Sequence, residues 1–185
     1  MTENGRKRNK AGIIWLFLML VWLTVIFSFS AKKADESTVM SHSVGKLIGN
    51  IVIPEYRSWP EDKQEQFAEK IDFPVRKCAH ASEYAVLGVL MLGTAYSFAE
   101  DRGKKNRLLC WCAGTAYAAT DEFHQLFVPG RSCQFGDVCI DSAGILTSIV
   151  LFSLIKHQIA KYNEKKKVAK NVKNQGKSLD KNHDS

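Results

Sequence analysis

The sequence contains no GxSxG nucleophile motif, no Walker loop and no glycine-rich dinucleotide fingerprint. Its five cysteines are an odd number, too few for a disulfide-dense chain, and they include no CxxC pair of the metal-binding kind. We find no internal repeat. The composition also excludes a collagen-like or wholly disordered chain, and the length of 185 residues fits about one domain.

Charge and apolar residues are segregated along the chain. The 26 Lys and Arg residues exceed the 19 Asp and Glu residues, for a formal net charge of +7. Taken as an average, this charge is typical of a small basic domain that binds nucleic acid. The apolar residues lie in blocks, however, and the positive charge lies in some of the gaps between them, so the average is a poor guide.

The first apolar block, residues 11–29, carries no charge and is long enough to cross a hydrocarbon core of about 30 Å as a helix. The basic residues before it, Arg6, Lys7, Arg8 and Lys10, would also suit a signal peptide. The run is longer than a signal h-region of about 7–15 residues, so we predict an uncleaved anchor.

Three further apolar segments follow, at about residues 75–98, 108–127 and 137–155, each interrupted by ionisable residues at one end. A soluble helical protein with buried helices is the alternative. The uncharged stretches at 85–95 and 143–155 leave few polar faces for water and favour a membrane. The predicted fold is all-α: a polytopic membrane protein with a bundle of four transmembrane helices and a long, partly helical outer linker after the first span.

The distribution of charge predicts the orientation of this membrane domain, residues 11–155. Basic residues gather in the N-terminus (1–10), in the second linker and in the tail (156–185), which alone has nine lysines. Positive residues near membrane ends stay cytoplasmic, so both termini are predicted inside and the first and third linkers outside. The lipid bilayer thus accounts for the charge without nucleic acid. The tail has few large apolar residues and is predicted to be disordered.

The long outer linker is predicted to be partly helical. Ser58 and Glu61 have capping-box spacing around Pro60, which predicts a short helix over 59–71. Asp72 and Pro74 then mark the entry to the second span. Earlier in the linker, one helical stripe that could lie on the membrane surface is formed by Val44, Leu47, Ile48 and Ile51. The histidines outside the spans (His42, His157 and His183) are expected to be exposed.

Polar and ionisable side chains gather at one end of each of the last three predicted spans. They are Arg76, His80 and Glu83 on the second span, Asp121, Glu122, His124 and Gln125 on the third, Arg131 in the turn that follows, and Asp137 and Asp141 on the fourth. These three ends must lie on the same side of the membrane, which the charge distribution makes the outside.

Charged groups at membrane depth are costly, on the order of 2.5–3.5 kcal/mol each even on the mild insertion scale. The simplest structural explanation is an ion-paired plug, with Arg76 paired to Glu83 and Arg131 paired to Asp121 or Asp137. Two histidines, an amide and an excess of acids go beyond what such a plug requires. We therefore predict a functional site.

Three motifs carry a resemblance to a known family. They are RKxxHxxEY at residues 76–84, DExHQxFVPGR at residues 121–131 and DxxxDxxG at residues 137–144. Together they resemble the motifs of the VanZ-like membrane proteins, and the resemblance runs from about residue 15 to residue 155. The namesake of that family lowers sensitivity to the glycopeptide teicoplanin, which implies a role in the cell envelope.

The residues suggest an enzyme that acts on a lipid-linked or cell-envelope substrate at the outer leaflet. His124 or His80 would be the general acid or base, because an imidazole titrates near neutrality. It would be oriented by Glu122, Glu83 or Asp121. Arg131 and Arg76 would hold a phosphate or carboxylate of the substrate, and the binding site would be completed by Gln125, Asp137 and Asp141.

Two other classes of function stay open. The same imidazoles and carboxylates are ligands that Zn, Mn or Fe accept, so metal-dependent chemistry is a second hypothesis, and the sequence leaves the identity of any cofactor unknown. The third is a non-catalytic module that binds a lipid, a glycopeptide or a partner protein through the same cavity. Glutamine replacements at Glu122 and His124 would be tolerated by a binder but not by an acid–base enzyme.

Overall fold

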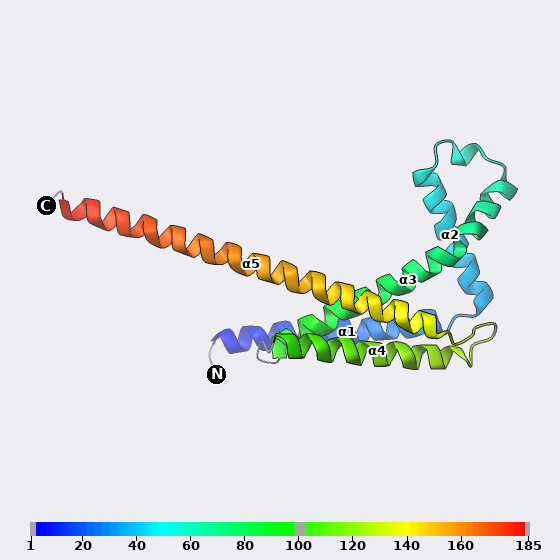
Figure 1. The fold of residues 1–185 in the computed structure, drawn as a ribbon, viewed down its shortest axis with the longest axis horizontal. Coiled ribbons are helices and arrows are strands. Elements are labelled where there is room, and N and C mark those ends of the chain that lie inside the picture. Colours follow the sequence, from blue (N-terminus) through cyan, green and yellow to red (C-terminus); the bar gives the residue numbers. More distant parts are fainter. Residues whose placement is uncertain (1–2, 99–102, 184–185) are drawn as a thin grey trace. The chain divides into compact units, whose positions relative to one another are not determined.

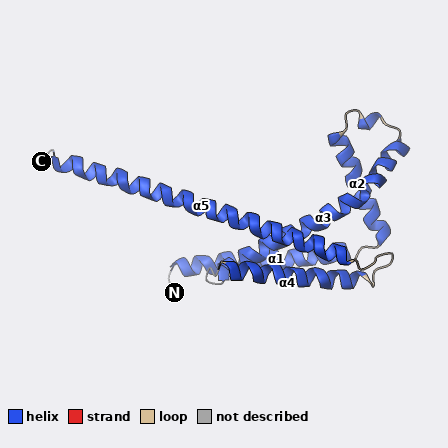
Figure 2. Cartoon of the chain, in the orientation of Figure 1, coloured by secondary structure: helices blue, strands red, loops and turns tan. Residues whose placement is uncertain are grey.

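The computed structural model describes residues 3–98 and 103–183, and within these ranges the chain is all helical, as predicted (Figure 1, Figure 2). The elements are α1 (Glu3–Ser30), α2 (Ala34–Val52), the 3₁₀ turn η1 (Tyr56–Ser58), α3 (Glu61–Phe98), α4 (Lys104–Gln125) and α5 (Phe135–His183). Arg102, which contributes to the predicted cytoplasmic linker, lies outside the described residues. The chain divides into two compact units, Met1–Ile149 and Val150–Ser185.

Two helices in the described part of the chain are long and apolar enough to cross a membrane, namely the segments Lys10–Ser30 and Phe135–Ala169. Of the other two predicted spans, 75–98 lies within α3, and 108–127 lies in α4 except for its last two residues. Their average hydropathy is lowered by the ionisable residues that the sequence places at one end of each.

Helices α1, α3 and α4 pack together in the first unit and build its core (Figure 1). The indole Nε1 of Trp22 in α1 donates to the carbonyl oxygen of Glu83 in α3, at 2.9 Å. The Tyr117 hydroxyl in α4 donates to the carbonyl oxygen of Leu23 in α1, at 3.0 Å. Among the fully buried side chains are Ile26 and Tyr84. The Tyr117 hydroxyl and the Trp22 indole therefore satisfy their hydrogen bonds in the core, whereas the buried Tyr84 hydroxyl has no hydrogen-bond partner in the described part of the chain.

The first turns of α5 approach α3 closely through two glycines. A Cβ at Gly88 would lie 3.0 Å from the carbonyl oxygen of Ile145, and a Cβ at Gly144 would lie 3.1 Å from the carbonyl carbon of Ala81. Backbone atoms cannot move aside as a flexible side chain can. The two helices can pack at this separation only because neither position carries a side chain.

Replacing Gly144 with alanine is expected to destabilise the protein by about 1–3 kcal/mol, because the new methyl group collides with the backbone of α3. Gly136, in the first turn of α5, provides the matched control, since a Cβ there meets nothing within 4 Å. Gly136→Ala should be neutral or slightly stabilising, because alanine is the better helix former. Thermal unfolding in detergent measures both variants, and equal midpoints would contradict the packing described.

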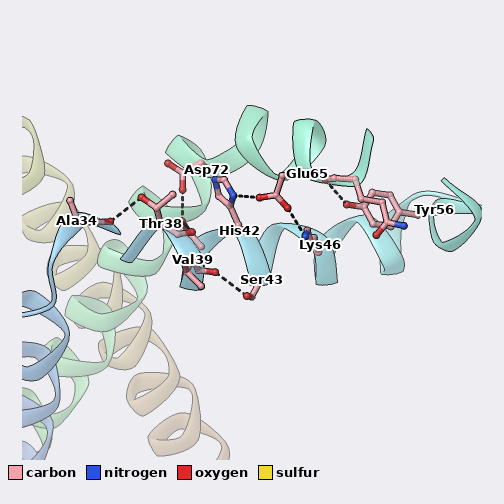
Figure 3. A network of polar contacts seen from close by, with 11 residues as sticks. Ala34, Thr38, Val39, His42, Ser43, Lys46, Tyr56, Glu65 and Asp72 are labelled. Atoms are coloured by element: carbon pink, nitrogen blue, oxygen red, sulfur yellow. Dashed lines mark hydrogen bonds and ion pairs between the residues drawn. The ribbon is translucent and has the colours of Figure 1, made fainter. Parts of the chain in front are cut away.

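Helix α2 and the first half of α3 form an antiparallel hairpin joined by side-chain contacts (Figure 3). The Glu65 carboxylate lies 2.6 Å from Nδ1 of His42 and 2.5 Å from Nζ of Lys46. Nearer the core, the Ser41 hydroxyl donates to Asp72. His42 was expected to be exposed, but its side chain is only 19% accessible. The expectation of an exposed His42 was wrong, because its side chain is covered by contact with Glu65, which lies 23 positions further along the chain.

The predicted break at Asp72 and Pro74 is also wrong, because α3 continues from Glu61 through Pro74 to Phe98 as one helix. Helix α3 begins at Glu61, two residues after the predicted start, with Glu61 and Asp62 in its first turn. The predicted capping box does not form, because Ser58 lies in η1 and its hydroxyl donates to the carbonyl oxygen of Glu55. Proline in a helix interior removes one backbone hydrogen bond. The contacts of α2 with Glu65 and Asp72 lie on the N-terminal side of Pro74 and hold that part of the helix in place.

The hairpin is expected to loosen in acid. The hydrogen bonds from Lys46 and His42 lower the pKa of Glu65 below its ordinary 4.5. A carboxylate with a lowered pKa stabilises the fold above its unfolded-state value and loses that contribution as the pH falls through the folded-state value. The amide-exchange protection of α2, corrected for the intrinsic effect of pH, should therefore fall below about pH 4.5.

The Glu65→Gln variant should lose this acid dependence and show low protection of α2 at neutral pH. Glu69→Gln is the control, because Glu69 is exposed on the same helix. If the amide-exchange protection of α2 in the unsubstituted protein does not change with pH, Glu65 does not stabilise the hairpin as described.

Helix α5 continues to His183 and includes the described part of the tail, from residue 156, that is predicted from the sequence to be disordered. The physical reason lies in composition. The tail contains no proline and is rich in lysine, which is a good helix former, so its local propensity is helical although it has few residues to bury.

Candidate functional site

Polar residues of α3 and α5 meet in two cross-helix pairs. Lys77 in α3 forms an ion pair with Asp137 in the first turn of α5. One turn further on, Nδ1 of His80 lies 3.9 Å from Oδ1 of Asp141, which is too long for a hydrogen bond. The two pairs lie on neighbouring turns of α3 and α5. The close approach at Gly144 sets the separation of the two helices.

The end of α4 joins the same region. The backbone N–H of Gln134 donates to Oε2 of Glu122, at 2.9 Å. The Gln125 amide donates to the Ser30 hydroxyl at the end of α1, at 3.2 Å. The chain turns between α4 and α5 at Pro129 and Gly130, where Gly130 has a φ of 76° that favours glycine. This turn brings Gln134 back over the end of α4.

Several polar atoms of this cluster are buried without a hydrogen-bond partner in the described part of the chain. They are His80 Nδ1, Asp121 Oδ1, Glu122 Oε1 and both carboxyl oxygens of Asp141. Glu122 is 1% exposed and Asp141 is 0% exposed. An unsatisfied buried polar group costs about 1–3 kcal/mol, so a group retained only for stability would be expected to have a partner.

Two arginines lie at the edge of this cluster. Nε of Arg131 donates to the carbonyl oxygen of Lys32, at 3.2 Å, and Arg76 forms an ion pair of 2.9 Å with Asp72. Burial and the nearby Arg76 lower the pKa of Arg131 from its ordinary value. The plug pairings considered from the sequence, Arg76 with Glu83 and Arg131 with Asp121 or Asp137, are therefore wrong among the described residues. Asp137 pairs with Lys77 instead.

Two cavities meet at the cluster. A small one of about 110 Å³ is lined mainly by polar side chains, among them Lys77, Gln125 and Asp137. A larger one of about 770 Å³ runs between α1, α2 and α3, and Glu83 and Asp121 lie in its lining. Arg76, His80 and Arg131 line both cavities.

His124 lies one turn after Asp121 on α4, and its Nδ1 is buried without a hydrogen-bond partner in the described part of the chain. Its ring packs against Phe27 of α1, with ring centroids 4.7 Å apart, and it lines neither of these cavities. Conversely, three residues of the cluster were not among the site residues predicted from the sequence: Lys77, Gln134 and Ser30. Lys77 could have been found, because it follows Arg76 and lies three residues before His80; the roles of Gln134 and Ser30 depend on contacts that only the fold creates.

In the described part of the chain, no three His, Cys, Asp or Glu side chains are grouped so that they could hold a metal ion. All five cysteines are free, including Cys133 and Cys139 near the cluster. The arrangement is instead suited to proton transfer, since it joins an imidazole to buried carboxyl groups, and to binding an anion through the two arginines.

The fold and the cluster define a class of protein: an all-helical chain with apolar helices and a buried polar site at their ends. The family model described as VanZ/LLP1 matches residues 15–156, and the chain belongs to this family. The match covers all three motifs that carry the resemblance in the sequence. No curated protein and no solved structure matches the chain.

Proposed function

We propose that the protein is an integral protein of the cell membrane with four spans, at 11–29, 75–98, 108–127 and 137–155, and with both termini in the cytoplasm. Large apolar side chains are exposed along α1 and α4, among them Phe17 at 63% and Leu109 at 65%. Exposure of this extent is costly in water and is expected in lipid. The positive charge of the tails and of the second linker supports the orientation.

Thiol labelling tests this topology. Cys133 is free and exposed in the turn after α4. A variant that retains only Cys133 should react with a membrane-impermeant thiol reagent in intact cells. A variant whose only cysteine is introduced at exposed Asn163 should react only after lysis. The reverse pattern would place the cluster in the cytoplasm and overturn the proposed orientation.

Within this membrane domain, the polar cluster acts on a lipid-linked or cell-envelope substrate at the outer face, and its action changes susceptibility to the glycopeptide teicoplanin. His80 transfers the proton, since it is the imidazole at both cavities, with Asp141 beside it. Arg131 and Arg76 hold an anionic group of the substrate. The observation that supports this function is the set of buried, unpartnered carboxyl and imidazole groups contributed by α3, α4 and α5.

A non-catalytic module that binds an envelope lipid, a glycopeptide or a partner protein is the second candidate. The observation that favours it is the size of the larger cavity, about 770 Å³, which lies in the range of ligand pockets and exceeds what proton transfer needs. A binder depends on hydrogen bonding and shape, whereas an acid–base enzyme also depends on a group that exchanges protons.

The Glu122→Gln variant separates the two candidates. Glutamine keeps the oxygen that accepts from the Gln134 N–H but cannot exchange a proton at that position. Teicoplanin susceptibility and envelope lipid composition should be compared at equal expression in cells that carry the unsubstituted protein, Glu122→Gln or the exposed control Glu164→Gln. Loss in Glu122→Gln alone supports the enzyme. Full function in Glu122→Gln would reject acid–base chemistry at this residue and favour the binder.

A further inference from the structure

The larger cavity is a groove whose walls come from three helices. The end of α1 contributes Ile26 and Phe29, α2 contributes Val44 and Ile48, and α3 contributes Val75. Its volume of about 770 Å³ falls within the range of about 300–1,000 Å³ that is typical of ligand sites. The apolar side chains of the walls suit a hydrocarbon chain rather than a polar ligand.

One end of the groove is polar and continues into the cluster. Arg76, His80 and Arg131 line both the groove and the small polar cavity, so the two cavities share this wall. Asp121 also lines the groove, is 4% exposed and has an unpartnered Oδ1. A ligand in the groove would therefore need a polar group at the end that faces these residues and an apolar group along the rest.

The charges at that end favour an anion. The groove lining contains Lys32, Arg76 and Arg131 against the acidic residues Glu83 and Asp121, so cationic groups are in excess. Arg76 is paired with Asp72, and Arg131 forms no ion pair with any described residue. Arg76 and Arg131 are close enough for the one to lower the pKa of the other. Two neighbouring guanidinium groups, one of them without a carboxylate partner, form a site that a phosphate would neutralise through charge-assisted hydrogen bonds.

We infer that the groove binds an anionic phospholipid, with an acyl chain between α1, α2 and α3 and the head-group phosphate against Arg131 and Arg76. This inference rests on the proposed function and names the class of ligand for that site. Helix α2 forms the outer wall, and its exposed apolar residues, such as Leu47 at 57% and Ile51 at 75%, suit contact with the membrane surface. A lipid could thus enter from the outer leaflet.

Photochemical labelling tests the inference directly. The full chain is reconstituted in phosphatidylcholine vesicles that contain phosphatidylglycerol with a photoreactive group on its acyl chain. Labelled peptides should come from residues 37–48 and 71–83, which line the groove. Labelling should be reduced by unlabelled phosphatidylglycerol and not by additional phosphatidylcholine. Labelling spread evenly over the exposed residues of α1 and α4, with no competition, would show only annular lipid and overturn the inference.

Two pairs of variants test the two ends of the ligand. Ala79→Trp fills the groove and should reduce labelling of the groove peptides about tenfold, whereas Ala143→Trp adds the same bulk at an exposed site on α5 and should not.

Arg131→Gln should remove the preference for phosphatidylglycerol, and Arg57→Gln, on the exposed 3₁₀ turn, should keep it. Unchanged labelling in Ala79→Trp and Arg131→Gln would also overturn the inference.

The labelling result can fail independently of the proposed function. One outcome is that the groove peptides of the unsubstituted protein stay unlabelled while the Glu122→Gln variant no longer changes teicoplanin susceptibility. In that case the groove does not bind the lipid, and the proposed functional site is unaffected. If the groove is labelled specifically and Glu122→Gln retains full function, the groove binds lipid and an acid–base role of Glu122 is wrong.

Discussion

Replacing His80 with glutamine is expected to abolish the function of the site while the protein still inserts and folds. His80 lines both cavities, and its Nδ1 has no hydrogen-bond partner among the described residues, so the fold loses little when the ring is replaced. General acid–base catalysis contributes about 10²- to 10⁴-fold in rate, which is enough to remove a cellular effect. Teicoplanin susceptibility and envelope lipids should then match those of cells without the protein.

The control for this variant is His157→Gln, because His157 is an exposed histidine in the second unit and takes no part in the cluster. His124→Gln adds a second comparison. Its ring packs against Phe27, so its replacement should reduce stability more than that of His80 and function less. Normal function in His80→Gln with loss of function in His124→Gln, at equal stability, would move the proton-transfer role back to His124.

Replacing Lys77 with methionine is expected to have the largest effect on stability. Lys77 pairs with Asp137, and the side chains are 18% and 11% exposed. Removing one partner of a fully buried ion pair leaves an uncompensated charge and costs about 3–5 kcal/mol. This pair is partly open to solvent, so we expect a loss of about 2–4 kcal/mol. Thermal unfolding in detergent should therefore show a large fall in midpoint for Lys77→Met and almost none for Lys70→Met, since Lys70 is exposed on the same helix.

The double variant Lys77→Met with Asp137→Leu should recover most of that stability, because a hydrophobic pair of similar volume replaces a buried ion pair at little cost. A double variant as unstable as Lys77→Met alone would mean that the loss comes from packing rather than from the unpaired carboxylate.

The elements of the fold were predictable where local pattern alone determines them. The uncharged run 11–29 lies within α1, and the charged first turn after Pro60 marks the start of α3. The continuation of α3 through Pro74 was not predictable. It depends on contacts between residues about 20 to 30 positions apart, such as His42 with Glu65 and Ser41 with Asp72, which hold α3 straight through a local signal to stop.

The sequence predicted which helix ends bring polar residues together, but not the partners that these residues have. Helical spacing placed His80 near the polar start of α5, and the structure brings it within 3.9 Å of Asp141. Spacing could not decide which acid pairs with which base, because that depends on the separation and rotation of the helices. Asp137 therefore has Lys77 as its partner, and Arg76 has Asp72.

The central claim is that the buried carboxyl groups are retained for function and not for stability, and the Asp141→Asn variant tests it most directly. Asp141 is 0% exposed, and neither of its carboxyl oxygens has a hydrogen-bond partner among the described residues. Replacing it with an uncharged residue of the same shape should stabilise the protein, by about 2–4 °C in melting temperature for each kcal/mol gained, and should abolish function. A lower melting temperature with normal teicoplanin susceptibility and normal envelope lipids would contradict the claim and identify the cluster as a structural plug.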